Sequence, residues 1–381
     1  MISYKYKLYR TPKTKHLDKM LEEACFVWNH ALALQQRYYH IYHEHISLSK
    51  MRKHFVKRIH RNLLHSQTVQ KILERLEMSY QRFFNHLAKR RPKFKKEKDF
   101  RSFVFWQGGY SLKGNVLTIN RIKKRFKFSL SRPYDGRIKT FTVKRNNIGE
   151  FFIIIVLDKP HQSIEKSHNG ASVGIDFGLK KYMTLSDGTV VNNPQYMMES
   201  LPELRRRSHN LSKCKKGSNN KERKRKELAK LWDDITNKRN DFQWKLAHEL
   251  CRKYDYIFIE DLNLFNMKLG RRANRKLKDQ AHADFLAKLQ YVARKYGVLV
   301  HKIDRYYPSS KTCTCGYVNN DLKLSDRKWV CPHCGETHNR DLLAANNILR
   351  RGIYELESDS KTPSTTRKMV HSRLHSRISH Q

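Results

Sequence analysis

The segment 256–262 places two carboxylates directly after a run of bulky apolar residues. The run Tyr256–Ile259 favours a buried, extended strand, and Glu260 and Asp261 follow it. An acid at the tip of a buried strand lies where a ligand or a metal ion can reach it. Because neighbouring residues on a strand point to opposite faces, we expect Glu260 to face such a site and Asp261 to be structural.

Two other segments carry acids that could join Glu260. The apolar strand predicted at 173–175 leads into Asp176, and Asp341 opens an Ala- and Asn-rich helix. Between them the pattern predicts a hairpin, helices, a strand, a helix and a strand. This order is typical of an RNase H-like core, in which the first strand, the fourth strand and the last helix converge. We therefore predict that Asp176, Glu260 and Asp341 lie together.

Three converging carboxylates suit a site for two Mg²⁺ ions. Magnesium prefers oxygen ligands and keeps several waters, so three acids and a substrate phosphate suffice. Two-metal phosphodiester hydrolysis uses one ion to activate water and one to stabilise the leaving oxygen. Asp176 would bridge the ions, Glu260 and Asp341 would each complete one, and Arg340 could contact the scissile phosphate. For Asp341 alone, a helix-capping role is the alternative.

The charge of the chain points to a polyanionic partner. Lys and Arg number 79 against 35 Asp and Glu, a formal net charge of +44, and such self-repulsion opposes compaction unless a polyanion neutralises it. The longest apolar run, 151–157, is too short to span a bilayer, and the N-terminal residues lack an apolar secretory segment. We expect nucleic acid, bound in a strongly salt-dependent way, and no membrane.

Four of the seven cysteines form two close pairs, each followed by a glycine: Cys313, Cys315, Cys331 and Cys334. Two such pairs are typical of a zinc ribbon, in which thiolates bind a structural Zn²⁺. Their clustering indicates a reducing compartment and a metal rather than disulfides. The first pair is one residue shorter than the usual spacing. This leaves open that His333 or His338 replaces a thiolate, or that no metal binds.

The first 160 residues predict a small β-barrel with a helical insertion. Short strands separated by turn residues occupy 101–157, and residues 1–10 supply a first strand. Helical periodicity runs between about 17 and 87. Within it, Tyr and His are dense over 38–45, which suits either a solvated helix face or stacking on bases. The basic stretch 89–98 suits a solvated linker or a clamp on backbone phosphates.

A second basic region, 203–230, predicts two helices divided by Gly217–Asn220. Because it holds few acids, we expect its helices to repel one another unless phosphates lie alongside, the alternative being a solvated charged pair. A separate long helix is expected to follow it.

Several motifs together resemble the transposon-encoded TnpB family of RNA-guided DNA endonucleases, relatives of the type V CRISPR effectors. They are Gly174-Ile175-Asp176-Phe177-Gly178, Ile259-Glu260-Asp261-Leu262, Pro308–Cys313, Cys331–Gly335 and Asn339-Arg340-Asp341 with Ala344-Ala345-Asn346. The resemblance covers roughly residues 1–350 and is most specific in the C-terminal half. The three predicted catalytic acids match acidic positions of the family, whereas the spacing of Cys313 and Cys315 departs from its pattern.

The resemblance implies an α+β multidomain architecture. A wedge-like β-barrel would span 1–10 and 90–160, with a helical recognition lobe inserted at 11–89. A RuvC nuclease domain of RNase H-like fold would span 171–308 and 338–352, with a zinc-ribbon insertion at 309–337. The tail at 353–381 is basic and poor in apolar residues, so we expect it to be disordered.

The resemblance also implies a function. The protein would be a magnesium-dependent endonuclease that cuts target double-stranded DNA next to a short adjacent motif. A guide RNA from the element's own transcript would direct it, one chain per RNA, in the cytoplasm of a bacterium or archaeon at the nucleoid. Base pairing would read sequence while the protein holds shape and backbone. The candidate nucleic-acid contacts are Gln67, Gln70, Gln81, Lys93, Lys95, Arg205, Arg206 and Lys224.

Three other functions are compatible with parts of the sequence. A guided DNA-binding repressor would keep the fold without catalysis, but the acids are intact. A DNA transposase or resolvase of RNase H-like fold would also use three acids, yet would not need this much basic surface. A plain zinc-ribbon nucleic-acid-binding protein would leave the carboxylates at the strand ends unexplained.

Overall fold

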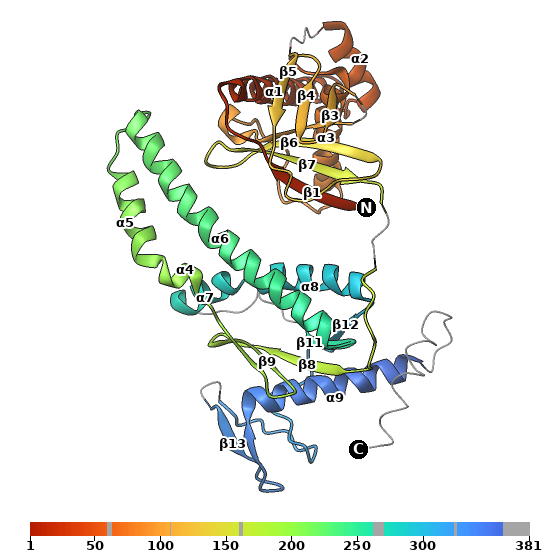
Figure 1. Ribbon diagram of the computed structural model, residues 1–381, viewed down its shortest axis with the longest axis vertical. Helices are drawn as coiled ribbons and strands as arrows, with labels where there is room; N and C mark the ends of the chain where they lie inside the picture. The colour runs from red at the N-terminus through yellow and green to blue at the C-terminus, as the bar shows by residue number, and fades with distance from the viewer. Residues whose placement is uncertain (59–62, 107, 160–162, 262–269, 324–325, 361–381) are drawn as a thin grey trace. The chain divides into compact units, whose positions relative to one another are not determined.

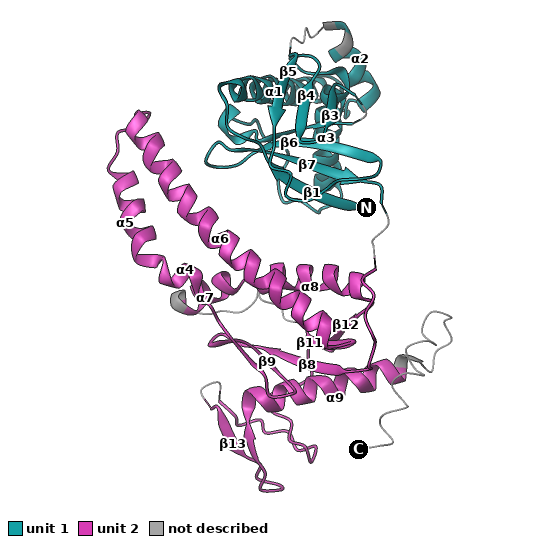
Figure 2. Ribbon diagram, viewed as in Figure 1, with its two compact units in different colours: residues 1–161 teal, residues 162–381 magenta. Residues whose placement is uncertain are grey.

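The computed structural model describes residues 1–58, 63–106, 108–159, 163–261, 270–323 and 326–360. The chain divides into two compact units, Met1–His161 and Gln162–Gln381 (Figure 2). Each unit has its own apolar core. Among the described helices, none combines the length and the hydropathy that crossing a bilayer requires.

Unit 1 contains two antiparallel sheets. The larger has the order β1-β7-β6-β2 and the smaller the order β3-β4-β5, and an antiparallel bridge between Leu8 and Phe128 links them. The strands are β1 (Ile2–Lys7), β2 (Ser102–Phe105), β3 (Tyr110–Lys113), β4 (Val116–Ile119), β5 (Lys124–Lys127), β6 (Ile138–Arg145) and β7 (Phe151–Leu157). These linked sheets occupy the region predicted as a small barrel, and β3 is a strand that the sequence pattern did not indicate.

Three helices lie between the first two strands of the larger sheet. They are α1 (Lys15–Tyr42), α2 (Leu48–Arg58) and α3 (Ser66–Phe84). Since β1 pairs with the distant strand β7, from Ile2 opposite Leu157 to Lys7 opposite Phe152, the helices are inserted between strands of one sheet. Buried positions recur every three or four residues along α1 and α3 and join the core beneath the strands.

Unit 2 is built on a five-stranded sheet with the order β10-β9-β8-β11-β12. Strands β8, β11 and β12 are parallel, and β9 and β10 are antiparallel to their neighbours. The strands are β8 (Ser172–Phe177), β9 (Lys181–Leu185), β10 (Val190–Asn192), β11 (Tyr256–Glu260) and β12 (Leu299–Ile303). The predicted strand order along the chain is therefore present.

Helices cover both faces of this sheet (Figure 1). The helices of unit 2 are α4 (Tyr196–Glu199), α5 (Leu201–Ser212), α6 (Asn219–Lys253), α7 (Arg271–Gln280), α8 (His282–Tyr296) and α9 (Arg340–Ser360). One face, with Ile175 and Ile259, packs in a common core with residues of α6 and α8. On the other face, Phe258 of β11 packs with Ile348 of α9. This alternation is expected for a strand buried on both sides.

Two glycines allow α9 to lie very close to the sheet. A Cβ atom added at Gly174 on β8 would lie 2.1 Å from the backbone oxygen of Ala345, and one added at Gly352 on α9 would lie 2.0 Å from the Phe258 ring. These distances are far below van der Waals contact, so any side chain would push the helix away. The close contact fixes where the first turn of α9, with Asp341, lies over the sheet.

Two predicted boundaries are wrong. The second basic helix and the long helix after it are one continuous helix, α6. Ser218 caps its N-terminus, because the Ser218 hydroxyl accepts a hydrogen bond from the Lys221 N–H at 3.1 Å. The start predicted for the disordered tail, residue 353, is wrong, because α9 continues to Ser360 and Ile353 and Leu356 pack against the core around Phe258. Residues 361–381 lie outside the described residues.

Candidate active site and metal centre

Asp176 and Glu260 lie side by side at the ends of neighbouring parallel strands. Ile175 of β8 is the Cα partner of Ile259 of β11, and each acid is the next residue on its strand. Adjacent strands are about 5 Å apart, so the two carboxylates can share a ligand. Because Ile175 and Ile259 face the core shared with α6 and α8, alternation directs both acids to the face covered by α9.

Asp341 lies in the first turn of α9. The helix is capped by Asn339, whose Oδ1 accepts hydrogen bonds from the backbone N–H groups of Asp341 at 3.2 Å and Leu342 at 3.4 Å. The capping alternative for Asp341 is therefore wrong, and its carboxylate is available for other partners. It pairs with Lys181 of β9 at 3.4 Å and with Arg327 at 3.2 Å.

Glu260 and Asp341 influence the ionisation of Asp176. Burial, followed by the charges of Glu260 and Asp341, raises the pKa of Asp176 to about 7, although the charges of Arg340 and Arg327 oppose this rise. Burial also raises the pKa of Glu260. A buried group of like charges is unfavourable unless protons or cations neutralise it. The structure thus brings the three predicted residues to one place, where a divalent cation would relieve their repulsion.

The spread of the carboxylates bears on how many ions they could hold. Among the described residues, two groups of three or more possible metal ligands have ligand atoms that all lie within 4.8 Å of one another. Both groups contain Cys313. The three acids are therefore spread more widely than the ligands of a single ion. A pair of ions would suit such a set better than a single ion.

Ser309 is a residue of this site to which the sequence assigned no role. Its hydroxyl donates a hydrogen bond to Glu260 Oε1, and its side chain is buried. The backbone around it is fixed by Asn347 of α9, whose Nδ2 donates to the carbonyl oxygens of Ser309 at 2.8 Å and Thr312 at 2.6 Å. Ser309 lies in the family motif Pro308–Cys313, which was the only sign in the sequence that it could matter. Its contact with Glu260 is visible only in the folded chain.

Replacing Ser309 with alanine is expected to slow cutting by about 10-fold, as is common when a residue that orients a metal ligand is lost. The hydrogen bond lowers the pKa of Glu260, so its loss should also move the pH of half-maximal cutting upward. The matched control is Ser310→Ala, because the Ser310 hydroxyl contacts Arg340 instead. If Ser309→Ala cut at the same rate as the unaltered protein and with the same pH profile, that result would contradict the role of Ser309 in orienting Glu260.

Asp261 and Arg340 are both engaged within the protein. Asp261 pairs with Lys302 at 2.9 Å and with Arg305, in agreement with the structural role expected for it. Arg340 donates to the Lys323 carbonyl at 2.7 Å and to Ser310 Oγ at 3.3 Å. Arg340 thus ties the loop after β12 to the start of α9, and its contact with a scissile phosphate stays a prediction.

The four cysteines of the two pairs converge. All four Sγ atoms lie within 4.8 Å of one another, with 3.5 Å between Cys313 and Cys334 and 3.8 Å between Cys315 and Cys331. Tetrahedral coordination with Zn–S bonds of about 2.3 Å requires sulfur atoms about 3.8 Å apart. The short Cys-x-Cys spacing therefore does not prevent the four thiols from taking the geometry of a structural zinc site.

Of the two nearby histidines, only His338 belongs to a group of possible metal ligands among the described residues. His338 Nε2 lies 3.0 Å from Cys313 Sγ, and the two also form an overlapping candidate group with Glu336. Burial raises the pKa of Cys313, but hydrogen bonds with the Cys315 backbone and with His338 outweigh it and bring the pKa to about 6. His333 belongs to neither group and stacks with Tyr317 at 6.3 Å between ring centroids.

The cysteine cluster is expected to carry close to one zinc per chain in purified protein, because the thiols are already placed for it. Cys331→Ser should reduce the zinc content severalfold and lower the unfolding temperature, since structural zinc contributes directly to folding. Cys214→Ser is the control, because Cys214 lies between α5 and α6 and contacts Asn210 and Asn220. Elemental analysis showing well under one zinc in the unaltered protein would contradict the site.

The predicted contacts in unit 1 lie in different environments. Gln67, Gln70 and Gln81 belong to α3, and Gln81 donates to Glu77 at 2.8 Å. Lys93 has an exposed side chain. Lys95 lies with its Nζ 4.0 Å from the centre of the Trp28 ring, and burial lowers its pKa. Contact of these residues with nucleic acid stays a prediction.

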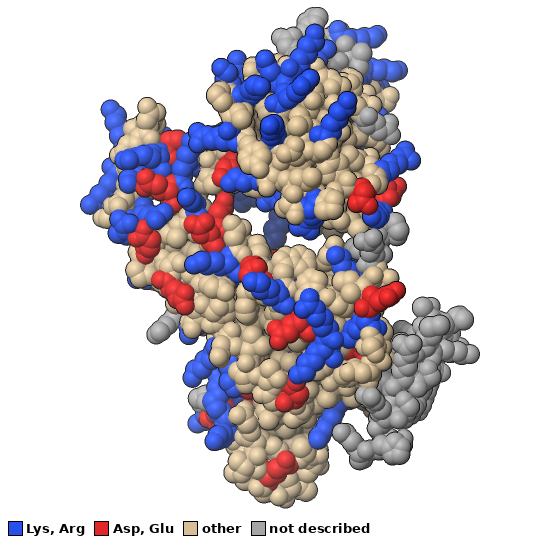
Figure 3. All heavy atoms as spheres, in the orientation of Figure 1, with Lys and Arg blue, Asp and Glu red and all other residues tan. Residues whose placement is uncertain are grey.

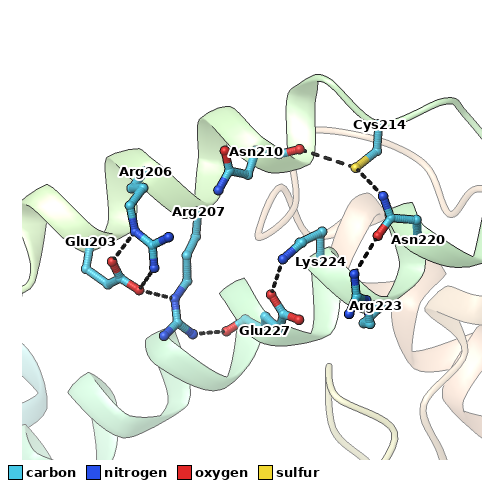
Figure 4. A network of polar contacts seen from close by, with 9 residues as sticks. All are labelled: Glu203, Arg206, Arg207, Asn210, Cys214, Asn220, Arg223, Lys224 and Glu227. Carbon is cyan, nitrogen blue, oxygen red and sulfur yellow. Dashed lines mark hydrogen bonds and ion pairs between the residues drawn. The ribbon is translucent and has the colours of Figure 1, made fainter.

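The helical hairpin of α5 and α6 balances part of its charge internally (Figure 4). Arg206 binds Glu203 through two hydrogen bonds of 2.7 Å, and Lys224 pairs with Glu227 at 3.0 Å. The expected repulsion is thus reduced by pairs spaced three or four residues apart. Arg205 has an exposed side chain. Figure 3 shows many further Lys and Arg side chains on the visible face of each unit.

Three family models match segments of the chain. The model of a "Helix-turn-helix domain" of the OrfB_IS605 group matches residues 1–43. The OrfB_IS605 model, described as "Probable transposase", matches residues 154–271. The model "Cas12f1-like, TNB domain" matches residues 282–348. The last match includes the cysteine cluster, Asp341 and the loop that carries Ser309.

Two named relatives each align with most of the chain. A Streptomyces pristinaespiralis protein named "Putative RNA-guided DNA endonuclease" is 32% identical over 292 residues, which are 76% of this chain and 72% of the relative. InsQ of Escherichia coli K12, also named as such an endonuclease, is 29% identical over 351 residues, 86% and 87% of the two chains.

A solved structure shares the fold. The Cas12f1 chain of a complex with sgRNA and target DNA superposes with a TM-score of 0.58 at 16% sequence identity, covering 89% of this chain and 83% of that chain. The fold is thus mixed α+β and Cas12f-like, with a four-cysteine cluster. The identity and coverage of the Streptomyces relative, together with the OrfB_IS605 match, establish that the chain belongs to the TnpB/OrfB_IS605 family, two members of which carry the name "Putative RNA-guided DNA endonuclease".

Proposed function

We propose that this protein is an RNA-guided, magnesium-dependent endonuclease of a transposon that cuts DNA next to a short adjacent motif. The observation that carries the proposal is the meeting of Asp176, Glu260 and Asp341, with the pKa of Asp176 raised to about 7 by burial and by the other two acids. A neutral-pH binding site for divalent cations is the chemistry that such a cluster supports best.

The residues of the site have separable tasks. When bound, two Mg²⁺ ions would supply the Lewis-acid chemistry of phosphodiester hydrolysis. Asp176 would hold both ions and Glu260 and Asp341 one each, while Ser309 orients the Glu260 carboxylate. Lys181 and Arg327, which pair with Asp341 in the free protein, are placed to turn toward a phosphate once cations occupy the acids.

The strand order of unit 2 supports the finer domain assignment. The order β10-β9-β8-β11-β12, with α9 across β8 and β11, suits a RuvC-like nuclease domain at 171–308 and 338–352. The cysteine cluster at 309–337 would be a structural zinc insertion within it. The sheets of unit 1 suit a wedge domain at 1–10 and 90–160, with the inserted helices at 11–89 as a recognition lobe.

The proposed partners are a guide RNA from the element's transcript and matched double-stranded DNA, with one chain per RNA. The net charge of +44 requires a large polyanion, and a guide–target heteroduplex supplies one. The solved Cas12f1 complex contains sgRNA and target DNA, which is consistent with partners of this class.

One experiment tests the function against its alternatives. The protein is purified from cells, its co-purifying RNA is sequenced, and that RNA is tested for magnesium-dependent cutting of a matched duplex beside a mismatched one. We expect cutting of the matched duplex only, lost after RNase treatment. Bound RNA without cutting would favour a guided repressor, and RNA-free protein that still cuts would favour a transposase.

A further inference from the structure

An aromatic cavity of about 420 Å³ opens in unit 1, far from the acids in sequence. Its volume lies within the range of roughly 300–1,000 Å³ that is usual for small-ligand sites. The lining comes from the C-terminal half of α1, from the connection between α1 and α2, from α3 and from the segment after α3. The lining residues that matter here are Gln35, Tyr39, His45, Tyr80, Phe84 and Arg91.

The lining combines aromatic rings that contact one another with aromatic rings that are about half exposed. Tyr80 is buried and its ring stacks on that of Phe84, with 5.9 Å between centroids and 27° between planes. His45 contacts both rings edge-on, at 5.1 and 5.5 Å. Even so, Phe84 is 47% exposed and Tyr39 is 48% exposed. Exposed aromatic faces around a hollow are typical of a binding site rather than of a core.

The polar groups of the cavity are arranged in a fixed order. Gln35, which is 3% exposed, shares a hydrogen bond of 2.8 Å with His45 Nδ1, and His45 Nε2 lies 2.8 Å from Glu77 Oε2. Gln35 Oε1 is buried and accepts no hydrogen bond within the described part of the chain. A buried acceptor without a donor costs free energy, and a ligand N–H group would relieve that cost.

The cation beside the cavity selects the charge of a ligand. The Arg91 guanidinium lies 6.0 Å from the centre of the Tyr39 ring and 5.6 Å from that of Phe83. Lys89 and Arg90 precede it with exposed side chains. Glu77 accepts hydrogen bonds from His45 and Gln81, and the three cations at 89–91 outnumber it, so the mouth of the cavity favours an anion.

The geometry points to a binding site for one unpaired nucleotide, with its base stacked on Tyr39 and Phe84 and its phosphate at Arg91. Aromatic stacking, an amide acceptor and a guanidinium are the groups that recognise a splayed-out base and its backbone. This inference depends on the proposed function in one respect, namely that the partner of the protein is nucleic acid. The same chemistry could come from the guide RNA or from the DNA.

Photo-crosslinking of the intact complex tests the site and separates the two sources. For RNA, cells are grown with 4-thiouridine and the purified complex is irradiated. For DNA, the complex is irradiated with a matched duplex that carries 4-thiothymidine. Peptide mapping should place a crosslink within 35–43 or 80–91 in one of the two arms. Crosslinks confined to other segments in both arms would overturn the inference.

Variants supply the second readout. Tyr39→Ala and Phe84→Ala should each lower the crosslink yield in the cavity and weaken binding of that nucleic acid by about 10-fold. Arg91→Gln, which leaves the rings intact, should weaken binding with a shallower salt dependence. Phe26→Ala is the matched control, since Phe26 is on α1 and 54% exposed but does not line the cavity. Equal losses in Phe26→Ala would also overturn the inference.

The inference and the proposed function fail separately. Guided cutting without a crosslink in the cavity would leave the endonuclease intact and remove the nucleotide site. A complex that carries no RNA and binds no matched duplex would remove both. A crosslink in the cavity of a protein that does not cut would keep the nucleotide site and favour the guided repressor.

Discussion

Replacing Asp176 with asparagine is expected to abolish magnesium-dependent cutting while RNA binding is retained. Asp176 is the acid whose pKa the other two raise, and it is the one placed to hold both ions. An amide cannot supply the negative charge that holds two divalent cations together, so we expect a loss of roughly 10³-fold or more in the cutting rate. The rate is measured on a matched duplex with saturating guide RNA.

The same substitution should make the metal-free protein more stable. The pKa of Asp176 is about 7 in the folded state and near 3.8 ordinarily. Between those values the folded state binds more protons than the unfolded state, so stability falls as pH rises from about 4 to 7 and stays low above that. Because asparagine does not ionise, Asp176→Asn removes this loss of stability at high pH. At pH 8 in EDTA we expect a gain on the order of 1–3 kcal/mol in the free energy of unfolding.

The matched control for this substitution is Asp261→Asn. Asp261 is the other acid beside Glu260, but it lies in surface ion pairs with Lys302 and Arg305, which contribute about 1 kcal/mol or less. It should retain cutting within a few-fold and show no gain in stability. Cutting by Asp176→Asn within 10-fold of the unaltered protein would exclude Asp176 from the site.

The parts of this fold that the sequence predicted are those in which each residue carries its own signal. Apolar runs that end in an acid indicate both a strand and a functional end, which is why Asp176 and Glu260 could be predicted at the ends of two strands. The cysteine pairs indicate a metal site by residue type alone. In both cases local pattern and tertiary position agree, so no knowledge of the partner residue was needed.

The parts that sequence reasoning missed depend on partners far away in the chain. The role of Ser309 exists only because Glu260, 49 residues earlier, lies within reach of its hydroxyl. The end of α9 was placed too early because residues 353–360 belong to a polar tail by composition. Ile353 and Leu356 reach the core around Phe258, and Glu355 pairs with Arg351 and His301, so tertiary packing outweighs composition there.

Replacing Gly174 with alanine is expected to be the most destabilising single methyl addition in unit 2. The new Cβ would lie 2.1 Å from the Ala345 carbonyl oxygen and 2.6 Å from the Leu349 backbone nitrogen. Both are backbone atoms of α9, so neither can rotate away, and the helix itself must shift. We expect a loss of about 3 kcal/mol or more in the free energy of unfolding, measured by denaturant titration.

A shift of α9 would also carry Asp341 away from Asp176, so Gly174→Ala should lose cutting even at temperatures where it stays folded. Gly270→Ala is the matched control, because no atom of the described residues lies within 4 Å of the Cβ that would be added there, and it should change stability by about 1 kcal/mol or less. If Gly174→Ala proved as stable and as active as Gly270→Ala, the close seating of α9 would not be what holds the third acid over the sheet.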